Sequence, residues 1–383
     1  MMLTASDLVD LTAFRQDLHR YPEVSREESA TAARIVQALV VLQPDQVVTG
    51  LGGHGVAAVF NGAEVGPTVL FRAELDALPI MELSEAAHRS TVPGKGHLCG
   101  HDGHMTLLMG LGRLIARQRP ARGRVVLMFQ PAEEDGSGAA AVVADPGFAA
   151  LRPDWAFSIH NMPGLPFGHS GLKAGAVNCA SQGLKITLSG KTAHASLPET
   201  GVSPALALAR LIPAISALGQ VGPLGPEYRL VTITHARLGE AAFGIAPGEA
   251  ELWATLRTME DGQMAALRAA AMDLARAEAA AQGLGVRFSH HDDFAASVND
   301  GQAVAHLGRA LDGLGMPYDA GDLPMRASED FGRFGQGGTR SAMLFLGVGE
   351  DHPALHNPDY DFPDTLIPIG VQIFDRVMRD LLG

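Results

Sequence analysis

Four nearly continuous apolar runs constrain the fold of this chain more than any other feature. They cover Val56–Phe60, Thr68–Arg72, Arg124–Phe129 and Trp155–Ile159. Helical patterns near Met105–Arg117 and Gly138–Ala144 lie between some of these runs. Strands that lack polar alternation are buried on both faces, as in a largely parallel sheet covered by helices. The pattern therefore predicts an α/β fold with three layers, in which helices cover both faces of the sheet.

The middle of the chain has a different order of elements. It reads as a strand, a helix, two strands, a long helix and a final strand, at Ser181–Ser189, Pro204–Leu218, Tyr228–Ala236, Glu249–Arg257, Gly262–Ala281 and Gly285–His291. This β-α-β-β-α-β order predicts a ferredoxin-like unit. The segments after it return to the first pattern. We therefore expect a catalytic domain made of residues 1–178 and 294–383, with an inserted ferredoxin-like domain at 179–293.

Residue types that bind metals are concentrated at Cys99-Gly100-His101-Asp102-Gly103-His104, where an extended segment meets a predicted helix. A thiol, two imidazoles and a carboxylate are costly to bury together unless they bind something, usually a divalent metal. Cysteine and histidine favour Zn, Mn, Co or Ni over Mg or Ca, and the sequence does not choose among the four. We expect Cys99 and His101 to be ligands, with Asp102 and His104 in supporting or capping roles.

Further polar clusters follow the ends of predicted strands. They are Glu74-Leu75-Asp76, Glu133-Glu134, His160-Asn161 and His356-Asn357-Pro358. In open α/β sheets the carboxyl ends of the strands converge on one crevice. Cys99, His101, His160, His356 and one glutamate of the pair would together hold two divalent ions and leave a position for water. The other glutamate would take a proton from that water and pass it to a leaving nitrogen.

Each of these residues also has an ordinary structural explanation. A buried cysteine is usually a small hydrophobe, a histidine can be a satisfied core residue, and paired glutamates often begin a helix. Their joint placement after strands favours the metal site. By contrast, Gly50-Leu51-Gly52-Gly53-His54-Gly55 matches a dinucleotide-binding spacing that requires a helix after it. Because Val56–Phe60 reads as a strand, we expect a hairpin turn there.

Charge and hydropathy exclude several kinds of partner. The net charge of −13 argues against nucleic acid and against an anionic membrane surface. No apolar run is long enough to cross a bilayer, and residues 1–20 contain no apolar signal core. Two cysteines, Cys99 and Cys179, cannot form a disulfide framework. These features predict a cytoplasmic protein that binds a small molecule, with neither nucleic acid nor membrane as a partner.

The motifs resemble those of metal-dependent amidohydrolases in kind and in order. They are Arg72-Ala73-Glu74-Leu75-Asp76-Ala77-Leu78-Pro79, Cys99–His104, Phe129-Gln130-Pro131-Ala132-Glu133-Glu134, His160-Asn161, Gly190-Lys191-Thr192-Ala193-His194-Ala195, Ser328-Glu329-Asp330-Phe331 and Leu355-His356-Asn357-Pro358. The resemblance is to hippurate hydrolases, indoleacetic-acid–amino-acid conjugate hydrolases, N-acetyl-diaminopimelate deacetylases and aminoacylases. It covers nearly the whole chain and implies a zinc-exopeptidase-like domain that binds two metals, with an inserted domain through which such enzymes usually form homodimers.

The resemblance also implies a role for individual residues. The ligands would be Cys99, His101, Glu134, His160 and His356, with Glu133 as the general base.

Residues outside the ligand set receive roles in the same way. Asp76 would orient a metal-binding side chain, and His194 would stabilise the oxyanion, often from the partner subunit. Arg257 is a candidate for binding the substrate carboxylate, although it could equally form a surface ion pair. Two positions depart from the family pattern: Glu74 replaces the usual aspartate, and Gly244 stands where many relatives have asparagine.

We therefore expect hydrolysis of the amide bond of N-acyl amino acids or related small amides, with Glu133 as base. A dipeptidase or exopeptidase on the same scaffold is the alternative enzyme. A metal-dependent binding protein without catalysis is the alternative from another class. The intact Glu133 and His194 favour an enzyme.

Overall fold

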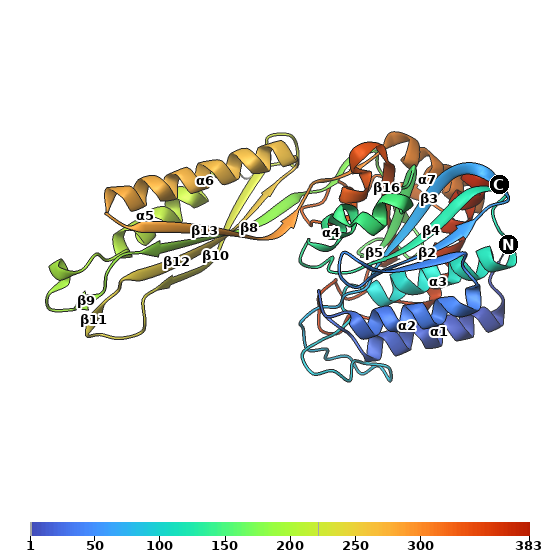
Figure 1. The fold of residues 1–383 in the computed structure, drawn as a ribbon, viewed down its shortest axis with the longest axis horizontal. Coiled ribbons are helices and arrows are strands. Elements are labelled where there is room, and N and C mark those ends of the chain that lie inside the picture. Colours follow the sequence, from blue (N-terminus) through green and yellow to red (C-terminus); the bar gives the residue numbers. More distant parts are fainter. Residues whose placement is uncertain (1, 221) are drawn as a thin grey trace. The chain divides into compact units, whose positions relative to one another are not determined.

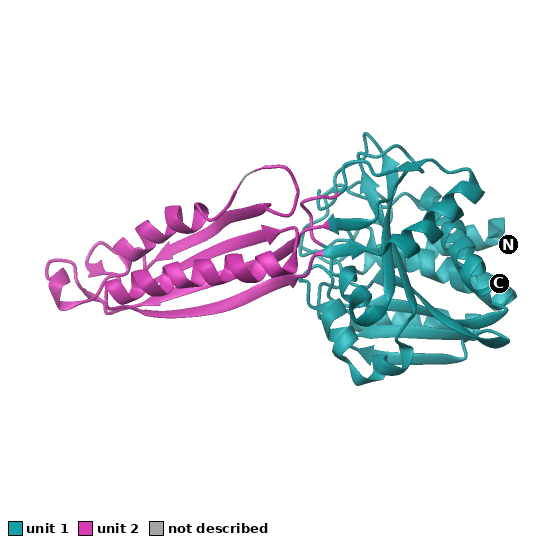
Figure 2. Cartoon of the chain, turned by 90° about the horizontal axis from the view of Figure 1, so that it is seen from above, with its two compact units in different colours: residues 1–177, 297–323, 329–383 teal, residues 178–296, 324–328 magenta. Residues whose placement is uncertain are grey.

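A computed structural model describes residues 2–220 and 222–383 of the chain. The chain forms two compact units (Figures 1 and 2). Unit 1 comprises Met1–Val177, Ser297–Leu323 and Glu329–Gly383, and unit 2 comprises Asn178–Ala296 and Pro324–Ser328. Most of unit 2 is one continuous segment that interrupts unit 1 in the sequence, and the short segment 324–328 also belongs to unit 2. The boundaries expected from the sequence place residues 324–328 in the second part of the catalytic domain.

Unit 1 is built on an eight-stranded mixed sheet with the order β1-β2-β4-β3-β5-β16-β6-β15. Its strands are β1 Gln46–Leu51, β2 Gly55–Asn61, β3 Glu64–Glu74, β4 Arg122–Gln130, β5 Trp155–Pro163, β6 Ser170–Gly171, β15 Tyr318–Asp319 and β16 Arg340–Gly349. The central strands β4, β3, β5 and β16 are parallel, while β1, β2 and β6 are antiparallel to their inner neighbours. The glycine motif at 50–55 is the turn between β1 and β2, as expected.

Helices cover both faces of this sheet (Figure 1). Their bounds are α1 Ala5–Arg20, α2 Ser29–Leu39, α3 His101–Arg117, α4 Gly138–Ala144, α7 Gly301–Leu314 and α8 Ile367–Leu382. The main core joins α1, α2, α3, α7 and α8 to one face, where Phe71, Leu108 and Phe374 are fully buried. Helix α4 and the 3-10 helix Phe331–Gly338 pack against the strands from the other side. The predicted three-layer arrangement is confirmed.

Unit 2 has the predicted β-α-β-β-α-β order. Its elements are β8 Ala180–Ser189, α5 Ala205–Ser216, β10 Arg229–Leu238, β12 Glu249–Thr258, α6 Asp261–Ala281 and β13 Gly285–Phe294. The strands form an antiparallel sheet with the order β10-β12-β8-β13, the ferredoxin-like arrangement. Burial alternates along β8, and the buried side chains, such as Leu184 and Ile186, pack with those of α5 and α6.

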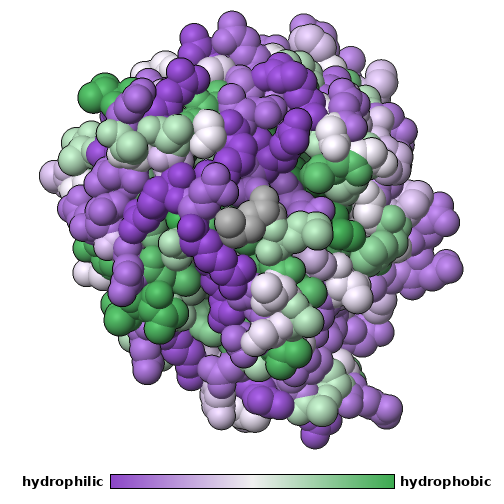
Figure 3. Space-filling view, turned by 90° about the vertical axis from the view of Figure 1, so that its right-hand side faces the viewer, coloured by the Kyte–Doolittle hydropathy of each residue, from purple (hydrophilic) through white to green (hydrophobic). Residues whose placement is uncertain are grey.

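One face of the molecule is mainly polar. On the face drawn in Figure 3, hydrophilic residues predominate and apolar side chains gather only in small, separate groups. Such scattered apolar residues are normal for a folded domain. Among the described residues, no helix is both long enough and apolar enough to traverse a bilayer.

Candidate metal centre

The five predicted ligands and Glu133 lie together in unit 1. Cys99 Sγ is 3.6 Å from His160 Nε2. Glu134 lies between two other histidines, with Oε1 3.8 Å from His101 Nε2 and Oε2 3.7 Å from His356 Nε2. Glu133 Oε2 is 4.0 Å from His101 Nε2. Residues 257 positions apart in the sequence thus bring sulfur, nitrogen and oxygen donors to one place.

Helix α3 begins at the centre of this cluster. Gly100 precedes it with φ +89°, and a Cβ at this position would lie 2.3 Å from Asn161 Oδ1. Only glycine allows this approach to β5, so the spacing between Cys99 and His101 depends on it. The start of α3 therefore brings two candidate ligands against a third, His160.

A strained turn after β4 presents the two glutamates. Ala132 has φ +50°, a left-handed conformation that costs a non-glycine residue about 1–2 kcal/mol. A Cβ on Gly138 would lie 1.6 Å from the Pro131 carbonyl oxygen, so the chain can close this turn only with glycine there. Glu133 and Glu134 precede α4 and do not begin it, which removes the helix-start explanation for the pair.

His356 reaches the cluster from the loop after β16. Its φ is +66°, and its backbone N–H donates to the Leu98 carbonyl oxygen at 2.8 Å. Its side chain is 49% exposed, in contrast to the buried His101 and His160. Strained conformations of this kind persist where the surrounding structure requires them, often at functional sites. The solvent reaches the site on the side of His356.

The hydrogen bonds of the two buried histidines fit metal ligation. His101 Nδ1 is 2.8 Å from the Asp76 carbonyl oxygen, and His160 Nδ1 is 2.8 Å from the Asn161 carbonyl oxygen. Since a carbonyl only accepts, each Nδ1 is the donor and each Nε2 faces the cluster. Metal-binding histidines usually show this pattern. His101 Nε2 and Glu134 Oε1 are buried without a hydrogen-bond partner, so the residues fit divalent cations.

Burial and neighbouring charges perturb the titration of the cluster. Burial, together with the Glu329 and Glu134 carboxylates, raises the pKa of Glu133 well above its usual range. Burial also raises the pKa of Glu134 to about 7, although His101 opposes this effect. Burial disfavours the charged form of His101, but Glu74, Asp76 and Glu134 raise its pKa to about 10. The site therefore favours positive charge, which a divalent cation would supply in place of protons.

Burial favours the neutral form of two further candidate ligands, Cys99 and His160. Burial, with the nearby Glu134 carboxylate, raises the pKa of the Cys99 thiol well above its usual range. Burial and His104 lower the pKa of His160 to about 3. A neutral imidazole is the form that binds metals, and a thiol must lose its proton to do so.

The carboxylate of Asp76 acts mainly on the glutamate turn. Its Oδ2 accepts hydrogen bonds from the Glu134 backbone N–H at 2.9 Å and from Ser25 Oγ at 2.7 Å. Its Oδ1 is 3.7 Å from His101 Nδ1, which is already bonded to the Asp76 carbonyl oxygen. Asp76 thus contacts one ligand through its backbone and another through its side chain.

The other two polar residues of the cysteine–histidine motif, His104 and Asp102, are bonded to residues outside the set of candidate ligands. His104 Nδ1 is 2.7 Å from Glu74 Oε2, and His104 Nε2 accepts the Asn161 backbone N–H at 3.3 Å. Neither nitrogen of His104 is therefore left for a metal. Asp102 Oδ2 is bonded to Arg15 Nη1 and His19 Nδ1. Both residues thus contact side chains around the candidate ligands.

A buried arginine of β3, Arg72, lies close to Glu133. Arg72 donates through Nε to Gln130 Oε1 at 2.8 Å and through Nη2 to Glu329 Oε1 and Asp330 Oδ1 at 2.8 and 2.7 Å. Its Nη1 also pairs with Glu74, the longer carboxylate that replaces the family aspartate. Arg72 therefore neutralises a group of buried carboxylates next to the proposed base.

The other predicted site residues belong to unit 2. The exposed His194 lies in the short strand β9 Ala193–His194, which pairs with β11 Ile245–Ala246. Ser196 donates to His194 Nδ1 from its backbone N–H at 3.1 Å, and its Oγ is 2.7 Å from the same atom. Because a backbone N–H only donates, Nδ1 is an acceptor and the ring hydrogen is on Nε2, free to donate elsewhere.

Arg257 and Gly244 have local partners within unit 2. Arg257 Nη1 donates to the Arg326 carbonyl oxygen at 2.9 Å and to Ser328 Oγ at 2.8 Å. The Gly244 carbonyl oxygen accepts the Ala195 N–H at 3.0 Å, beside His194. A Cβ on Gly244 would meet nothing within 4 Å, so asparagine could occupy this position.

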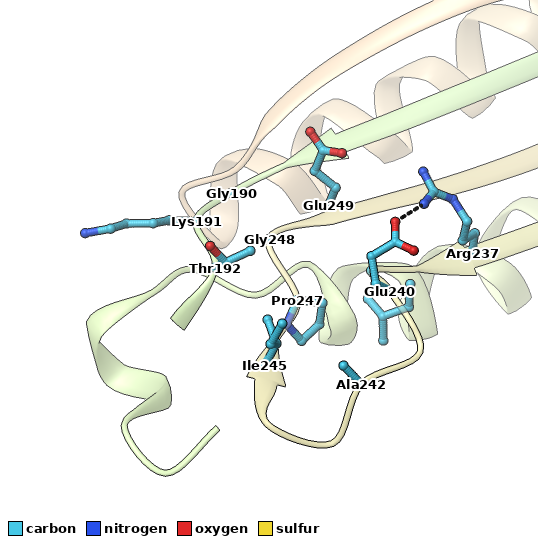
Figure 4. Close-up of a pocket in the computed structure, with 12 residues that line it drawn as sticks. Gly190, Lys191, Thr192, Arg237, Glu240, Ala242, Ile245, Pro247, Gly248 and Glu249 are labelled. Carbon is cyan, nitrogen blue, oxygen red and sulfur yellow. Dashed lines mark hydrogen bonds and ion pairs between the residues drawn. The ribbon is translucent and has the colours of Figure 1, made fainter. Parts of the chain in front are cut away.

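An open pocket of about 680 Å³ lies beside the paired strands β9 and β11 in unit 2 (Figure 4). Arg237 and Glu240 form an ion pair on one side of it, while Lys191 points away from the other labelled side chains. None of the predicted site residues lines this pocket.

Sequence reasoning missed the roles of several residues around the site. Arg72 lies in an apolar strand, and a charged residue there implies a buried partner; this signal could have revealed its cluster. Ser25 and Glu28 lie before α2, where nothing in the local sequence points to the glutamate turn. Their partners are known only from the fold.

Comparisons with known proteins agree with this geometry. Residues 70–380 match the family described as peptidase family M20/M25/M40. N-acetyl-L-cysteine deacetylase of Bacillus subtilis (strain 168) is 30% identical over 93% of this chain and 84% of its own length. IAA-amino acid hydrolase ILR1-like 5 of Arabidopsis thaliana is 29% identical over 95% of this chain and 84% of its own length.

A solved structure also resembles the whole chain. A dinuclear metal-binding peptidase of the M20 family from Bacillus subtilis superposes with a TM-score of 0.82 and 26% sequence identity, covering 99% of each chain. Two units with this fold, together with a family match over most of the length, identify the enzyme class. The chain belongs to peptidase family M20/M25/M40, whose members hydrolyse amide bonds.

Proposed function

We propose that this protein hydrolyses the amide bond of N-acyl amino acids or related small amides. The observation that carries this proposal is the free carboxylate of Glu133 beside a complete set of metal-ligand residues. The two relatives named above have substrates in which an acyl group is joined to the nitrogen of an amino acid. This shared chemistry supports the same substrate class here.

The residues would divide the reaction between them. Cys99, His101, Glu134, His160 and His356 would hold two divalent ions. When bound, such ions polarise a carbonyl oxygen and lower the pKa of water. Glu133 would accept the proton of the water that attacks the amide carbon and deliver it to the departing amine nitrogen.

Two residues of unit 2 have proposed roles in the reaction. We propose that His194 donates its Nε2–H to the oxyanion, because Ser196 keeps Nδ1 as an acceptor. Arg257 would bind the substrate carboxylate with the guanidinium N–H groups that its local partners do not use.

A homodimer through unit 2 is part of the proposal. Strand β10 lies at the edge of the four-stranded sheet, and most of its residues from Thr232 to Leu238 are exposed. Long exposed edge strands readily pair with another chain. Light scattering is expected to give a dimer, and a monomer at all concentrations would remove this part of the proposal together with any role of His194 across subunits.

The metal and the compartment follow from the ligands. Sulfur and imidazole donors favour Zn, Mn, Co or Ni, and one of these is proposed at each position. Ligation by Cys99 requires a reduced thiol, which fits the cytoplasm.

A reconstitution assay tests the function. The protein is stripped with a chelator, reloaded separately with Zn, Mn, Co or Ni, and given N-acetyl amino acids, N-benzoylglycine, N-acetyl-diaminopimelate and dipeptides. Release of free amine from the acyl amino acids, lost on chelation and restored by metal, is the expected result. Faster cleavage of dipeptides would favour the peptidase alternative. Metal binding without release of amine from any compound would indicate a binding protein.

A further inference from the structure

Glu28 is a buried carboxylate that makes no bond to the helix it precedes. Within its own segment, its Oε1 accepts the Arg26 backbone N–H at 2.8 Å. Glu28 occupies the position before helix α2, where acidic residues often cap the helix, but it makes no capping hydrogen bond. Glu23 bonds to the first turn instead, accepting the Ala30 and Thr31 backbone N–H groups at 3.2 and 2.6 Å. Glu28 is 0% exposed, and burying a carboxylate is costly. Its side chain therefore serves something other than its own helix.

The side chain of Glu28 is bonded to the glutamate turn. Its Oε1 accepts the backbone N–H of Ala132 at 2.8 Å, across 104 positions of sequence. Ala132 is the left-handed residue directly before Glu133. The Ala132 carbonyl oxygen in turn accepts the Gly138 N–H at 2.9 Å. Glu28 thus holds the first peptide of the turn that presents both glutamates.

The residues just before Glu28 hold the other end of the same turn. Ser25 Oγ donates to Asp76 Oδ2, which also accepts the Glu134 N–H. The backbone of this stretch is fixed as well, because the Ala77 N–H donates to the Glu23 carbonyl oxygen at 2.8 Å. We call residues 23–28 the brace segment. It reaches the turn twice, directly at Ala132 and through Asp76 at Glu134.

We infer that Glu28 is a positioning residue for Glu133 and Glu134, acting through the backbone of the turn. This inference rests on the proposed function, since it assigns Glu28 to the general base and to a metal ligand. The bond from Glu28 offsets the strain at Ala132 and keeps the peptide before Glu133 in one orientation. Without it, a buried N–H would lose its acceptor and the turn would relax toward an unstrained conformation.

Three variants test this inference in the full-length protein. Glu28→Ala removes the acceptor. Glu28→Gln keeps an oxygen that can accept the same N–H. Glu23→Ala is the matched control, because it removes the cap of α2 and leaves the bond to Ala132 intact. Hydrogen–deuterium exchange of the peptide that covers residues 130–136 is the first readout, followed by metal affinity, kcat and KM.

Glu28→Ala is expected to speed exchange in 130–136 at least tenfold, to weaken metal binding and to lower kcat at least tenfold with a smaller change in KM. Glu28→Gln should stay within about threefold of the wild type in kcat. Glu23→Ala should lower the thermal midpoint without altering exchange in the turn. Unchanged exchange in Glu28→Ala, or an equal effect of Glu23→Ala on the turn, overturns the inference. Because exchange needs no substrate, it decides the role of Glu28 even if no amide proves to be hydrolysed.

Discussion

Replacing Arg72 with methionine is expected to be among the most damaging single changes in unit 1. Arg72 is buried, and it pairs with the buried carboxylates of Glu74, Glu329 and Asp330. Removing one partner of a buried ion pair costs about 3–5 kcal/mol, because the other partner is left uncompensated. Three carboxylates share this cation, so the loss should reach the upper part of that range. The free energy of unfolding of a typical domain is about 5–15 kcal/mol.

The pH dependence of the loss distinguishes charge from packing. In the wild type, burial disfavours the ionised form of Glu74, but Arg72 and His104 hold its pKa well below the usual range. Without Arg72, burial would prevail and raise that pKa. The native state would then bind more protons than the unfolded state near neutral pH, so the variant should lose stability as pH rises and regain it as pH falls.

Urea unfolding followed by circular dichroism at pH 5.5 and 7.5 measures the loss of stability and its pH dependence. Where two transitions are resolved, each unit is analysed separately. Arg122→Met is the matched control, since this exposed arginine of β4 makes one hydrogen bond, to the Leu381 carbonyl oxygen. Arg122→Met should lower the free energy of unfolding by about 1 kcal/mol or less. The reasoning is refuted if Arg72→Met costs no more than this control at pH 7.5, or if its penalty does not shrink at pH 5.5.

Three further predictions concern the metal centre and its support. Glu133→Gln should keep the metal content, measured by atomic emission, and lower kcat by about 10²–10⁴-fold, and unchanged turnover would exclude Glu133 as the base. Cys99→Ala should lose at least one metal equivalent while Cys179→Ala, in unit 2, loses none; equal metal content in both variants would count against Cys99 as a ligand. Burial disfavours the charged form of His19, but Asp102 and Glu82 raise its pKa to about 10. The stability that this charge contributes is fully present below about pH 6.5 and should fade as pH rises toward 10. His19→Gln should therefore reduce the loss of unfolding free energy between these pH values. An unaltered pH dependence would show that His19 is not its source.

The sequence predicted the fold class because the determining patterns are local. Apolar runs such as Thr68–Arg72 can be satisfied only inside a covered sheet, and alternation in Ser181–Ser189 marks a strand with one exposed face. The strand order in the outer part of the unit 1 sheet is harder to predict from the sequence, because the two-residue strands β6 and β15 are too short to show a hydropathy pattern. Their pairing depends on the neighbours that the fold supplies.

The candidate ligands were also visible in the sequence, because ligand residue types that follow strand ends are unusual in both chemistry and position. His101 could be named in this way, whereas Glu134 was chosen from the glutamate pair through the family resemblance. The structure places His101 Nε2 3.8 Å from Glu134 Oε1. The residues that support these ligands could not be recognised in the sequence. Glu28 reads as an ordinary residue at a helix start, and its bond to Ala132 exists only because the fold carries the two segments to one place.

By itself, the sequence determined which residues can bind a metal, which glutamates are paired and which segments form strands or helices. These properties depend on residue type and short spacing. Only the tertiary structure decided that Arg72 neutralises buried carboxylates, that neither ring nitrogen of His104 is left for a metal, and that the brace segment holds the turn before Glu133. Such contacts join positions up to 257 residues apart, and their strength depends on burial, which the order of residues does not reveal.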